Sequence, residues 1–322
     1  MLRKAFTNPH FFKPLVPYSL SNQPFHLIPT FTQGDTVLPP NKKVQVRCVT
    51  LDGGGTTSKF CYEPVVSFIK GFDTKKMKLT SEQARGPMGI SKPKHIEELL
   101  RTEMLAQWLE HNQSMPDQNT VTEIHNAYLI QQREILKDVI AVPNMAQVIT
   151  TLRSQGLYIA LNTAYSREEA KIFAEALKKQ GIEFDFIITS SDVKEGRPHP
   201  FMLDGIMQYF GLTHPQELLV VGDTPADMQA AYRRNYPRVG AAGYSSLLNI
   251  NSNQEGLNMP AAQMLARQET AKTILKVHHA NYCMTDSEQL LDIVNDYNQR
   301  LLTGNFDPVA RIEPPENKFK PR

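Results

Sequence analysis

With 322 residues, 41% hydrophobic and 21% charged, the chain is long enough to bury one large core, or a core and a smaller satellite domain. Its formal net charge of +2 creates no strong field, which argues against nucleic acid or an anionic membrane as the main partner and favours a small molecule. Because no apolar run approaches the ~20 residues of a membrane span and only three scattered cysteines occur, we expect a reducing, cytoplasmic location.

Residues 1–44 differ from the rest of the chain. They contain seven prolines, a single acidic residue and no helical or strand periodicity. We therefore expect an irregular extension that lies over the body of the protein or over a partner subunit. An organelle-targeting peptide is the alternative; the prolines disfavour it because they break the amphipathic helix that such a peptide needs. The polar, proline-bearing residues 303–322 are predicted to form an irregular tail.

A short apolar strand is predicted at Val46–Leu51, and it ends in Asp52 followed by three glycines and two threonines. Glycine allows the backbone N–H groups of such a loop to approach a phosphoryl oxygen closely. Asp52 is therefore a candidate nucleophile on phosphorus. From this segment alone, an aspartate that only caps a glycine-rich turn fits equally well.

Residues 59–138 are predicted to form an inserted, all-helical cap domain. Helical periodicity recurs around Pro64–Lys70, Lys92–Glu110 and Val121–Leu136, and no segment between them has the pattern of a strand.

The fold class predicted for the rest is α/β, a Rossmann-like parallel sheet core made of residues 45–58 and 139–302. Strands and helices alternate, and parallel neighbours need helical crossovers on both faces of a sheet. The predicted segments are Leu157–Leu161 (strand), 166–180 (helix), Phe186–Ile188 (strand), 198–210 (helix), Leu218–Val221 (strand), 225–233 (helix), Val239–Ala241 (strand), Asn281–Met284 (strand) and 285–302 (helix). In such sheets ligands bind beyond the carboxyl ends of the strands.

Three further segments that follow predicted strands contain candidate phosphate- or metal-binding residues. Thr163 offers a hydroxyl and a following N–H for a phosphoryl group, although an ordinary helix N-cap would look the same. Asp223 and Asp227 lie just after a buried strand, where two carboxylates repel each other unless a cation such as Mg²⁺ sits among them; the alternative is that both cap a helix. Arg197, before a helix that Pro198 is expected to open, either clamps phosphate or makes a surface salt bridge.

In this order, these motifs resemble those of the haloacid dehalogenase phosphotransferases, from about Val44 to Leu302. The resemblance implies that Asp52 is the nucleophile and that Thr163 and Arg197 hold phosphoryl oxygens. It also implies a Mg²⁺ ion bound by Asp52, Asp223 and the backbone carbonyl of Gly54, with Asp227 orienting its water shell. Most phosphatases of that superfamily carry a second aspartate at the position of Gly54, where it protonates the leaving alkoxide.

The helical insertion resembles the cap of the phosphonoacetaldehyde hydrolase family. That family uses a Met, a Lys four residues later and a His three residues beyond it, and the same spacing gives Met88, Lys92 and His95. Lys92 would form an imine with the aldehyde and His95 would move protons. The alternatives are that Lys92 is an ordinary exposed lysine and that Lys94 is the lysine concerned.

Two more positions match the substrate pocket of that family. They are Cys61 and Tyr165, for which a buried structural cysteine and a packing tyrosine are the alternatives. The resemblance also implies a homodimer that packs through its cap helices.

Some positions depart from the family pattern. Gly53 and Gly54 replace a Trp and an Ala, Lys94 replaces an acidic residue, and Asn235 replaces a glycine that ends a helix. Asparagine is the next-best residue for a left-handed helix end, so the last change is expected to be harmless.

The function expected from the sequence is hydrolysis of the C–P bond of phosphonoacetaldehyde through a Lys92 imine and an Asp52 phosphate. A C–P bond has no leaving oxygen to protonate, which suits a glycine at residue 54. The alternatives are another Mg²⁺-dependent phosphohydrolase of the same superfamily, which turnover of simple phosphate esters would favour, and a non-catalytic binding protein on that fold, which absence of turnover would favour.

Overall fold

The computed structural model describes residues 44–307 and residue 312. The predicted N-terminal extension, apart from residue 44, and most of the predicted C-terminal tail lie outside these described residues. Among the described helices, none is both long enough and apolar enough to cross a membrane.

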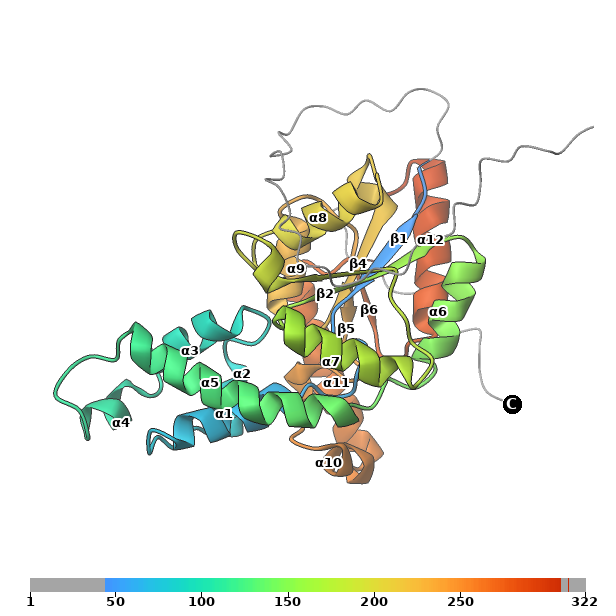
Figure 1. The fold of residues 1–322 in the computed structure, drawn as a ribbon. Helices are drawn as coiled ribbons and strands as arrows, with labels where there is room; N and C mark the ends of the chain where they lie inside the picture. Colours follow the sequence, from blue (N-terminus) through green and yellow to red (C-terminus); the bar gives the residue numbers. More distant parts are fainter. Residues whose placement is uncertain (1–43, 308–311, 313–322) are drawn as a thin grey trace, which may run out of the picture.

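The centre of the described chain is a parallel sheet of six strands in the order β3-β2-β1-β4-β5-β6 (Figure 1). This confirms the predicted α/β class. The strands are β1 (Cys48–Leu51), β2 (Tyr158–Thr163), β3 (Phe186–Thr189), β4 (Leu218–Gly222), β5 (Arg238–Ala241) and β6 (Tyr282–Met284). Because β1 and β4 are central neighbours, the loops that follow them meet at the same edge.

Helices cover both faces of this sheet. Side chains of a strand point alternately to the two faces, so Val49 and Leu51 of β1 pack in one apolar core while Cys48 packs in the other. The first core is completed by α6 (Met145–Ser154), α7 (Arg167–Lys178) and α12 (Gln289–Thr303), and the second by α8 (Phe201–Tyr209) and α9 (Pro225–Tyr232).

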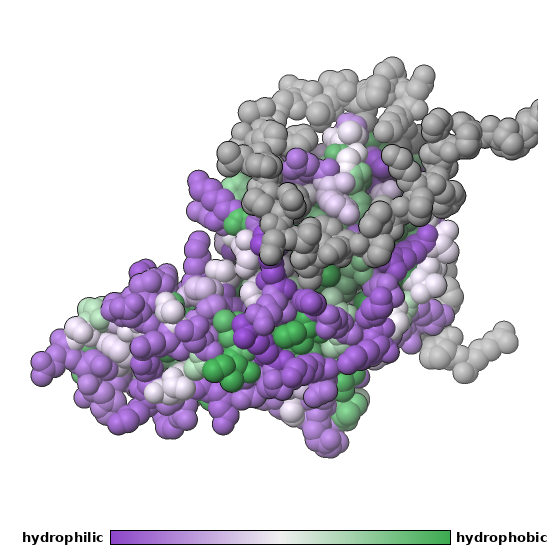
Figure 2. Space-filling view, viewed as in Figure 1, coloured by the Kyte–Doolittle hydropathy of each residue, from purple (hydrophilic) through white to green (hydrophobic). Residues whose placement is uncertain are grey.

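Five α-helices between β1 and α6 form a lobe beside the sheet, and hydrophilic residues dominate its viewed surface (Figures 1 and 2). They are α1 (Glu63–Asp73), α2 (Ser81–Arg85), α3 (Lys92–Arg101), α4 (Leu105–Leu109) and α5 (Gln118–Ile135). The lobe has an apolar core of its own, which includes Phe68, Phe72, Ile96, Ile124 and Tyr128. Between residues 59 and 138, all described, no strand occurs, as expected.

Several helices differ from the prediction. The segment predicted as one helix, Lys92–Glu110, is two helices, because the chain turns at residues 102–104 and buries Met104 in the core of the lobe. The helix predicted at residues 198–210 begins only at Phe201, because residues 197–200 form a turn and Pro200 is its N-cap. Four α-helices of the described residues were not predicted: α2, α6, α10 (Asn253–Asn258) and α11 (Ala261–Val277).

Candidate active site

The carboxylate of Asp52 lies at the carboxyl edge of the central strand β1. The Asp52 backbone N–H continues the sheet by donating to the Val221 carbonyl at 2.9 Å. The Thr57 hydroxyl donates to the Asp52 carbonyl at 2.6 Å, which closes the glycine-rich loop that follows the strand. Sheet and loop together therefore fix the position of this buried side chain.

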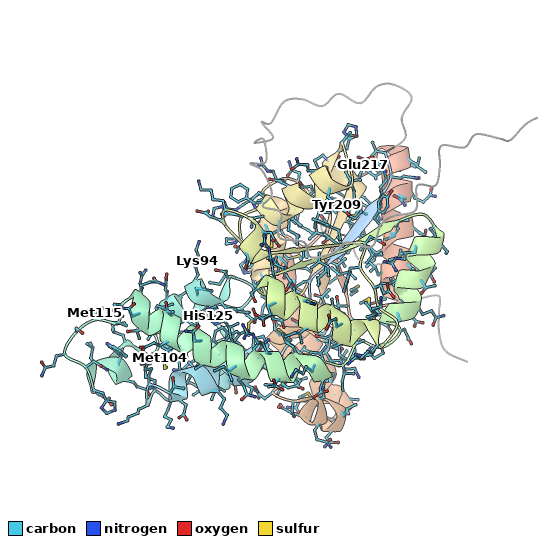
Figure 3. The ribbon with its side chains drawn as sticks, viewed as in Figure 1. Lys94, Met104, Met115, His125, Tyr209 and Glu217 are labelled. Carbon is cyan, nitrogen blue, oxygen red and sulfur yellow. The ribbon has the colours of Figure 1, made fainter. Side chains whose placement is uncertain are left out.

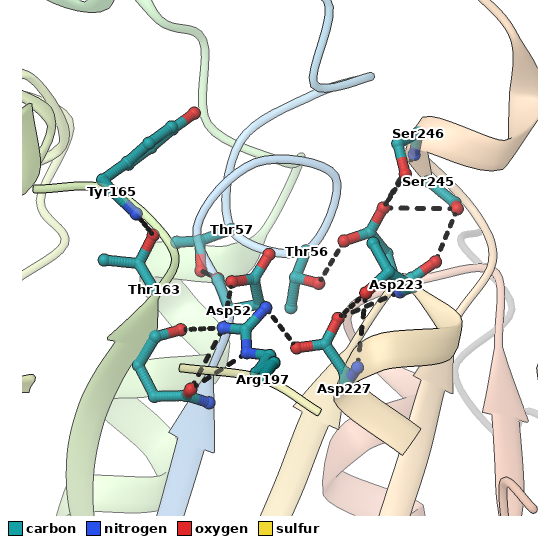
Figure 4. Close-up of polar contacts among 12 residues, drawn as sticks. Asp52, Thr56, Thr57, Thr163, Tyr165, Arg197, Asp223, Asp227, Ser245 and Ser246 are labelled. Carbon is teal, nitrogen blue, oxygen red and sulfur yellow. Dashed lines mark hydrogen bonds and ion pairs between the residues drawn. The ribbon is translucent and has the colours of Figure 1, made fainter. Parts of the chain in front are cut away.

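Asp223 and Asp227 follow β4 and lie beside Asp52 (Figure 4). Asp227 caps α9, since its Oδ2 accepts from the Thr224 N–H at 3.0 Å and from the Thr224 hydroxyl at 2.6 Å. Asp223 does not cap a helix. Its Oδ2 instead accepts from the Ser246 N–H and hydroxyl, both at 2.7 Å. The alternative in which both acids cap a helix is therefore wrong for Asp223.

Three buried carboxylates in one cluster repel one another unless a cation lies among them. One ligand oxygen each of Asp52, Asp223 and Asp227 lie within 4.8 Å of one another. Burial, followed by the charge of Asp52, raises the pKa of Asp223 to about 8. Burial raises the pKa of Asp227 to about 6 against the opposing charge of Arg197. Buried hard oxygen ligands of this kind fit Mg²⁺, which takes few carboxylates and keeps several waters.

Arg197 provides a positive charge within this cluster. Its guanidinium donates to Asp52 Oδ1 at 2.6 Å and pairs with Asp227 Oδ1 at 2.5 Å. Asn162 orients it, because the backbone carbonyl of Asn162 accepts from Nη2 at 2.6 Å. Burial would lower the pKa of Arg197, but the charges of Asp227 and Asp52 outweigh it and raise that pKa. With only 4% of Arg197 exposed, the surface salt bridge is the wrong alternative.

Thr163 ends β2, the strand next to β1. Its hydroxyl oxygen accepts from the Tyr165 N–H at 3.2 Å, so hydroxyl and N–H lie together at the edge of the sheet. The N-cap of the following helix α7 is Ser166, not Thr163, which makes the N-cap alternative wrong.

Lys92 brings an amine from the helical lobe to this edge. It is 4% exposed, and its Nζ lies 5.6 Å from the centroid of the Tyr165 ring and 5.7 Å from that of Phe68. Nζ makes no hydrogen bond or ion pair with the described residues, and burial lowers the pKa of Lys92. Lys94, by contrast, is exposed on the surface of the lobe (Figure 3). Of the two candidate lysines, only Lys92 faces the site.

Three further predicted site residues are also buried. His95 is fully buried against the Phe68 ring, and neither of its ring nitrogens has a hydrogen-bond partner among the described residues. Burial holds the pKa of His95 well below 6.5, so the imidazole is neutral. Met88 belongs to the apolar core of the lobe, and Cys61 is 8% exposed.

Sequence reasoning did not find the groups that orient the charged residues. Ser245 and Ser246 hold Asp223, and Asn162 holds Arg197. A signal for the serines existed, because they follow β5 and the carboxyl ends of parallel strands meet at one edge.

Known proteins identify the family of this chain. A sequence model described as "Haloacid dehalogenase-like hydrolase" matches residues 61–241, which is more than half of the chain. The chain belongs to this hydrolase family.

Relatives of this haloacid dehalogenase-like hydrolase include proteins named phosphonoacetaldehyde hydrolase. One from Bacteroides fragilis is 28% identical over 80% of this chain and 98% of the relative. One from Bacillus cytotoxicus is 28% identical over 78% of this chain and 96% of the relative. The match to a bifunctional phosphonoacetaldehyde hydrolase/aminoethylphosphonate transaminase of Clostridioides difficile is 27% identical and spans 42% of that protein.

A similar solved structure supports the fold assignment. It is the phosphonoacetaldehyde hydrolase-like protein from Oleispira antarctica, with a TM-score of 0.78 and 23% identity. The alignment covers 83% of this chain and 99% of that chain.

The space beside Gly54 is limited in this hydrolase. A β-carbon at residue 54 would lie 2.6 Å from Cys61 Sγ, whereas one at Gly53 would meet its nearest neighbours at 3.4 Å, an ordinary contact. The thiol of Cys61 therefore fills the space that a side chain at residue 54 would need. An aspartate two residues after Asp52 does not fit unless this part of the chain moves.

We expect Gly54→Ala to destabilise the protein by ~1–3 kcal/mol through overpacking against Cys61. The φ of Cys61 is 46°, a left-handed value that glycine tolerates, so Cys61→Gly can relieve the clash without backbone strain. The double variant Gly54→Ala/Cys61→Gly should be more stable, by about 1 kcal/mol or more, than the sum of the changes in the free energy of unfolding of the two single variants predicts. Urea unfolding measures all three free energies, with Gly53→Ala as the nearly neutral control. Additive effects would contradict the clash.

A buried acid also lies at the start of α1. Neither carboxylate oxygen of Glu63 has a hydrogen-bond partner among the described residues. Burial raises the pKa of Glu63 from 4.5 to about 7. The folded protein therefore holds this proton more tightly than the unfolded chain, and the stability that results is lost as the pH rises from 4.5 to 7.

We accordingly expect Glu63→Gln to be more stable than the wild type at pH 8, by about 3 kcal/mol, because the glutamine carries no buried charge. Below pH 4.5 the difference should vanish, since both folded and unfolded wild type are then protonated. Urea unfolding at several pH values tests this, with the exposed Glu98→Gln as control. A difference that does not change with pH would contradict it.

Proposed function

We propose that this haloacid dehalogenase-like hydrolase cleaves the C–P bond of phosphonoacetaldehyde to give acetaldehyde and phosphate. The proposal rests above all on Lys92, a buried amine that faces the aromatic ring of Tyr165 beyond the carboxyl edge of the sheet. An aldehyde substrate can condense with such an amine, a step that hydrolysis of a simple phosphate ester does not require. The relatives named phosphonoacetaldehyde hydrolase support the same substrate.

Lys92 acts first in the proposed reaction. Its free amine, favoured by burial, condenses with the aldehyde to give an imine and one water. The neutral imidazole of His95, one turn further along α3, accepts and returns the protons of this step.

Asp52 then attacks phosphorus in line. The C–P bond breaks, and its electron pair moves into the protonated imine to form an enamine while the phosphoryl group passes to Asp52. Protonation of the enamine carbon and addition of water release acetaldehyde and restore Lys92. A second water hydrolyses the aspartyl phosphate and restores Asp52.

The other charged groups would hold the phosphoryl oxygens and balance their charge. Thr163 and Arg197 bind these oxygens in the proposal. Asp52, Asp223 and the carbonyl of Gly54 would hold Mg²⁺, with Asp227 ordering its waters, and the ion would shield the negative charge that accumulates around phosphorus.

The crowding at Gly54 supports a phosphonate over a phosphate ester. Residue 54 is a glycine, and a β-carbon there would lie 2.6 Å from Cys61 Sγ, so this position offers no acid to protonate a leaving alkoxide. A C–P bond makes no such demand, because the imine of Lys92 accepts the electrons.

In the proposed reaction, each of two domains contributes one catalytic residue. Residues 59–138 act as a cap that carries Lys92, over a core of residues 45–58 and 139–302 that carries Asp52. We propose that the cap also forms a homodimer interface, since α5 exposes the apolar side chain of Ile130.

Acetaldehyde release from phosphonoacetaldehyde, coupled to an alcohol dehydrogenase, tests the function with Mg²⁺ and with excess chelator. We expect Mg²⁺-dependent turnover. An enzyme that instead hydrolyses a simple phosphate ester and releases no acetaldehyde is another phosphohydrolase of the family. Absence of any turnover would support a binding protein.

A further inference from the structure

A second contact between the cap and the core lies apart from Lys92, at the end of α2. The guanidinium of Arg85 reaches across to the core loop formed by residues 246–251. Its Nη1 donates to the carbonyl of Ser246 at 3.2 Å, and its Nε donates to Asn249 Oδ1 at 3.1 Å. Its Nη2 donates to the carbonyl of Ile250 and to Asn251 Oδ1. One side chain of the cap thus satisfies four acceptors of the core.

The core holds this loop in place without help from the cap. Arg267 donates to the carbonyls of Leu248 at 2.7 Å and Asn249 at 3.0 Å. Asn249 adopts a left-handed conformation with a φ of 53°. The backbone N–H of Asn251 donates to Glu255 at 2.8 Å. The loop is therefore a preformed receptor for a guanidinium, whose fork of five donors matches several fixed acceptors.

Each side of this contact is connected to a residue of the candidate site. Ser246, whose carbonyl accepts from Arg85, holds the carboxylate of Asp223 with its N–H and hydroxyl. On the cap side, Arg85 is seven residues before Lys92. Between them, Gly89 has a φ of 95° and packs so closely on the core that a β-carbon there would lie 2.5 Å from the Thr224 hydroxyl.

We propose that Arg85 is a positioning residue that docks the cap segment carrying Lys92 onto the core loop that holds Asp223. Docking fixes the position of the Lys92 amine relative to the Asp223 carboxylate and keeps Cys61 buried. The part of this inference that concerns the imine rests on the proposed function. The docking itself does not.

Alkylation of Cys61 by iodoacetamide measures docking without any substrate. Cys61 is 8% exposed, and both Asp223 of the core and Lys92 of the cap act on its pKa, which places it at the junction. We expect Cys61 to react about tenfold faster in Arg85→Ala than in the wild type, as loss of hydrogen bonds to a charged group implies. In Arg85→Lys, Cys61 should react nearly as fast as in Arg85→Ala, because an ammonium group does not reach all four acceptors.

Peptide mapping separates Cys61 from Cys48 and Cys283, which are buried in the core and should react at unchanged rates. Arg101→Ala, which removes an exposed arginine of the same cap, is the matched control and should behave as wild type. Asn249→Gly keeps the left-handed backbone and removes one acceptor. It should accelerate alkylation of Cys61 by a smaller factor and serves as the test if Arg85→Ala does not fold.

Turnover of phosphonoacetaldehyde by the same variants separates the two proposals. If docking positions Lys92, Arg85→Ala should lower kcat and reduce the yield of borohydride-trapped imine about tenfold or more. Equal alkylation rates in Arg85→Ala, Arg101→Ala and wild type would overturn the docking role, as would equal acceleration at all three cysteines. A wild type that releases no acetaldehyde would refute the proposed function while the alkylation result still decides the docking.

Discussion

Lys92→Arg is expected to lower the release of acetaldehyde from phosphonoacetaldehyde by a factor on the order of 10³ or more. Arginine keeps the positive charge but is never deprotonated in proteins, so it forms no imine. The wild-type amine differs because burial lowers its pKa and leaves part of it free. The assay is acetaldehyde release at saturating Mg²⁺.

Lys94→Arg is the matched control, two residues away in the same helix but exposed. It should retain wild-type turnover. Because arginine is larger than lysine in a buried site, Lys92→Met provides a second variant of similar shape that lacks the amine. It should fold, since it removes a buried charge without a hydrogen-bond partner. Turnover in either Lys92 variant above a tenth of the wild-type rate would contradict the imine.

The sheet and most of the charged cluster were predictable because both depend on local patterns. Buried parallel strands are short apolar runs, and three of them here lead directly into a residue of the candidate site: Asp52 after β1, Thr163 at the end of β2 and Asp223 after β4. Once the strands were predicted to be parallel, the juxtaposition of Asp52, Thr163 and Asp223 followed from topology. Asn235 also behaves as predicted, since its φ of 55° ends the α9 segment in the left-handed region.

Helix α11 was missed because its apolar residues do not form a single stripe. Leu265 is 57% exposed and Val277 59% exposed, while Ala271 and Leu275 are buried. Periodicity identifies a helix only when one face is apolar and the other polar, so this pattern gives no signal. A helix of this kind is fixed by its tertiary contacts, here with Cys283 of β6 and its neighbours.

Contacts between segments that are distant in the sequence could not be predicted either, because local sequence patterns carry no information about them. The Arg85 contact with Ser246 joins residues 161 positions apart, and no sequence pattern links the two. A positive charge near Asp227 could be predicted from the sequence, because clustered carboxylates need a cation, and Arg197 provides it. Its geometry depends on Asn162, whose role becomes visible only when β2 and the turn after β3 are placed together.

Asp52→Asn is expected to lower turnover of phosphonoacetaldehyde by a factor on the order of 10⁴, because the amide is no nucleophile towards phosphorus. The change is nearly isosteric, and the amide oxygen can still accept the hydrogen bond that Arg197 donates at 2.6 Å. Removing the Asp52 charge should also lower the pKa of Asp223, which that charge helps to raise. The variant is thus expected to fold as the wild type does, and thermal unfolding verifies this.

Comparing substrates distinguishes the aspartate from the lysine. Asp52→Asn should abolish any hydrolysis of simple phosphate esters as well, whereas Lys92→Arg should affect only the aldehyde substrate, because the imine plays no part in ester cleavage. Asp204→Asn is the control for loss of a buried carboxylate elsewhere, since Asp204 bonds the Tyr236 hydroxyl at 2.8 Å and lies outside the cluster. If Asp52→Asn kept its turnover while Asp223→Asn lost it, water rather than Asp52 would attack phosphorus, and no aspartyl phosphate would form.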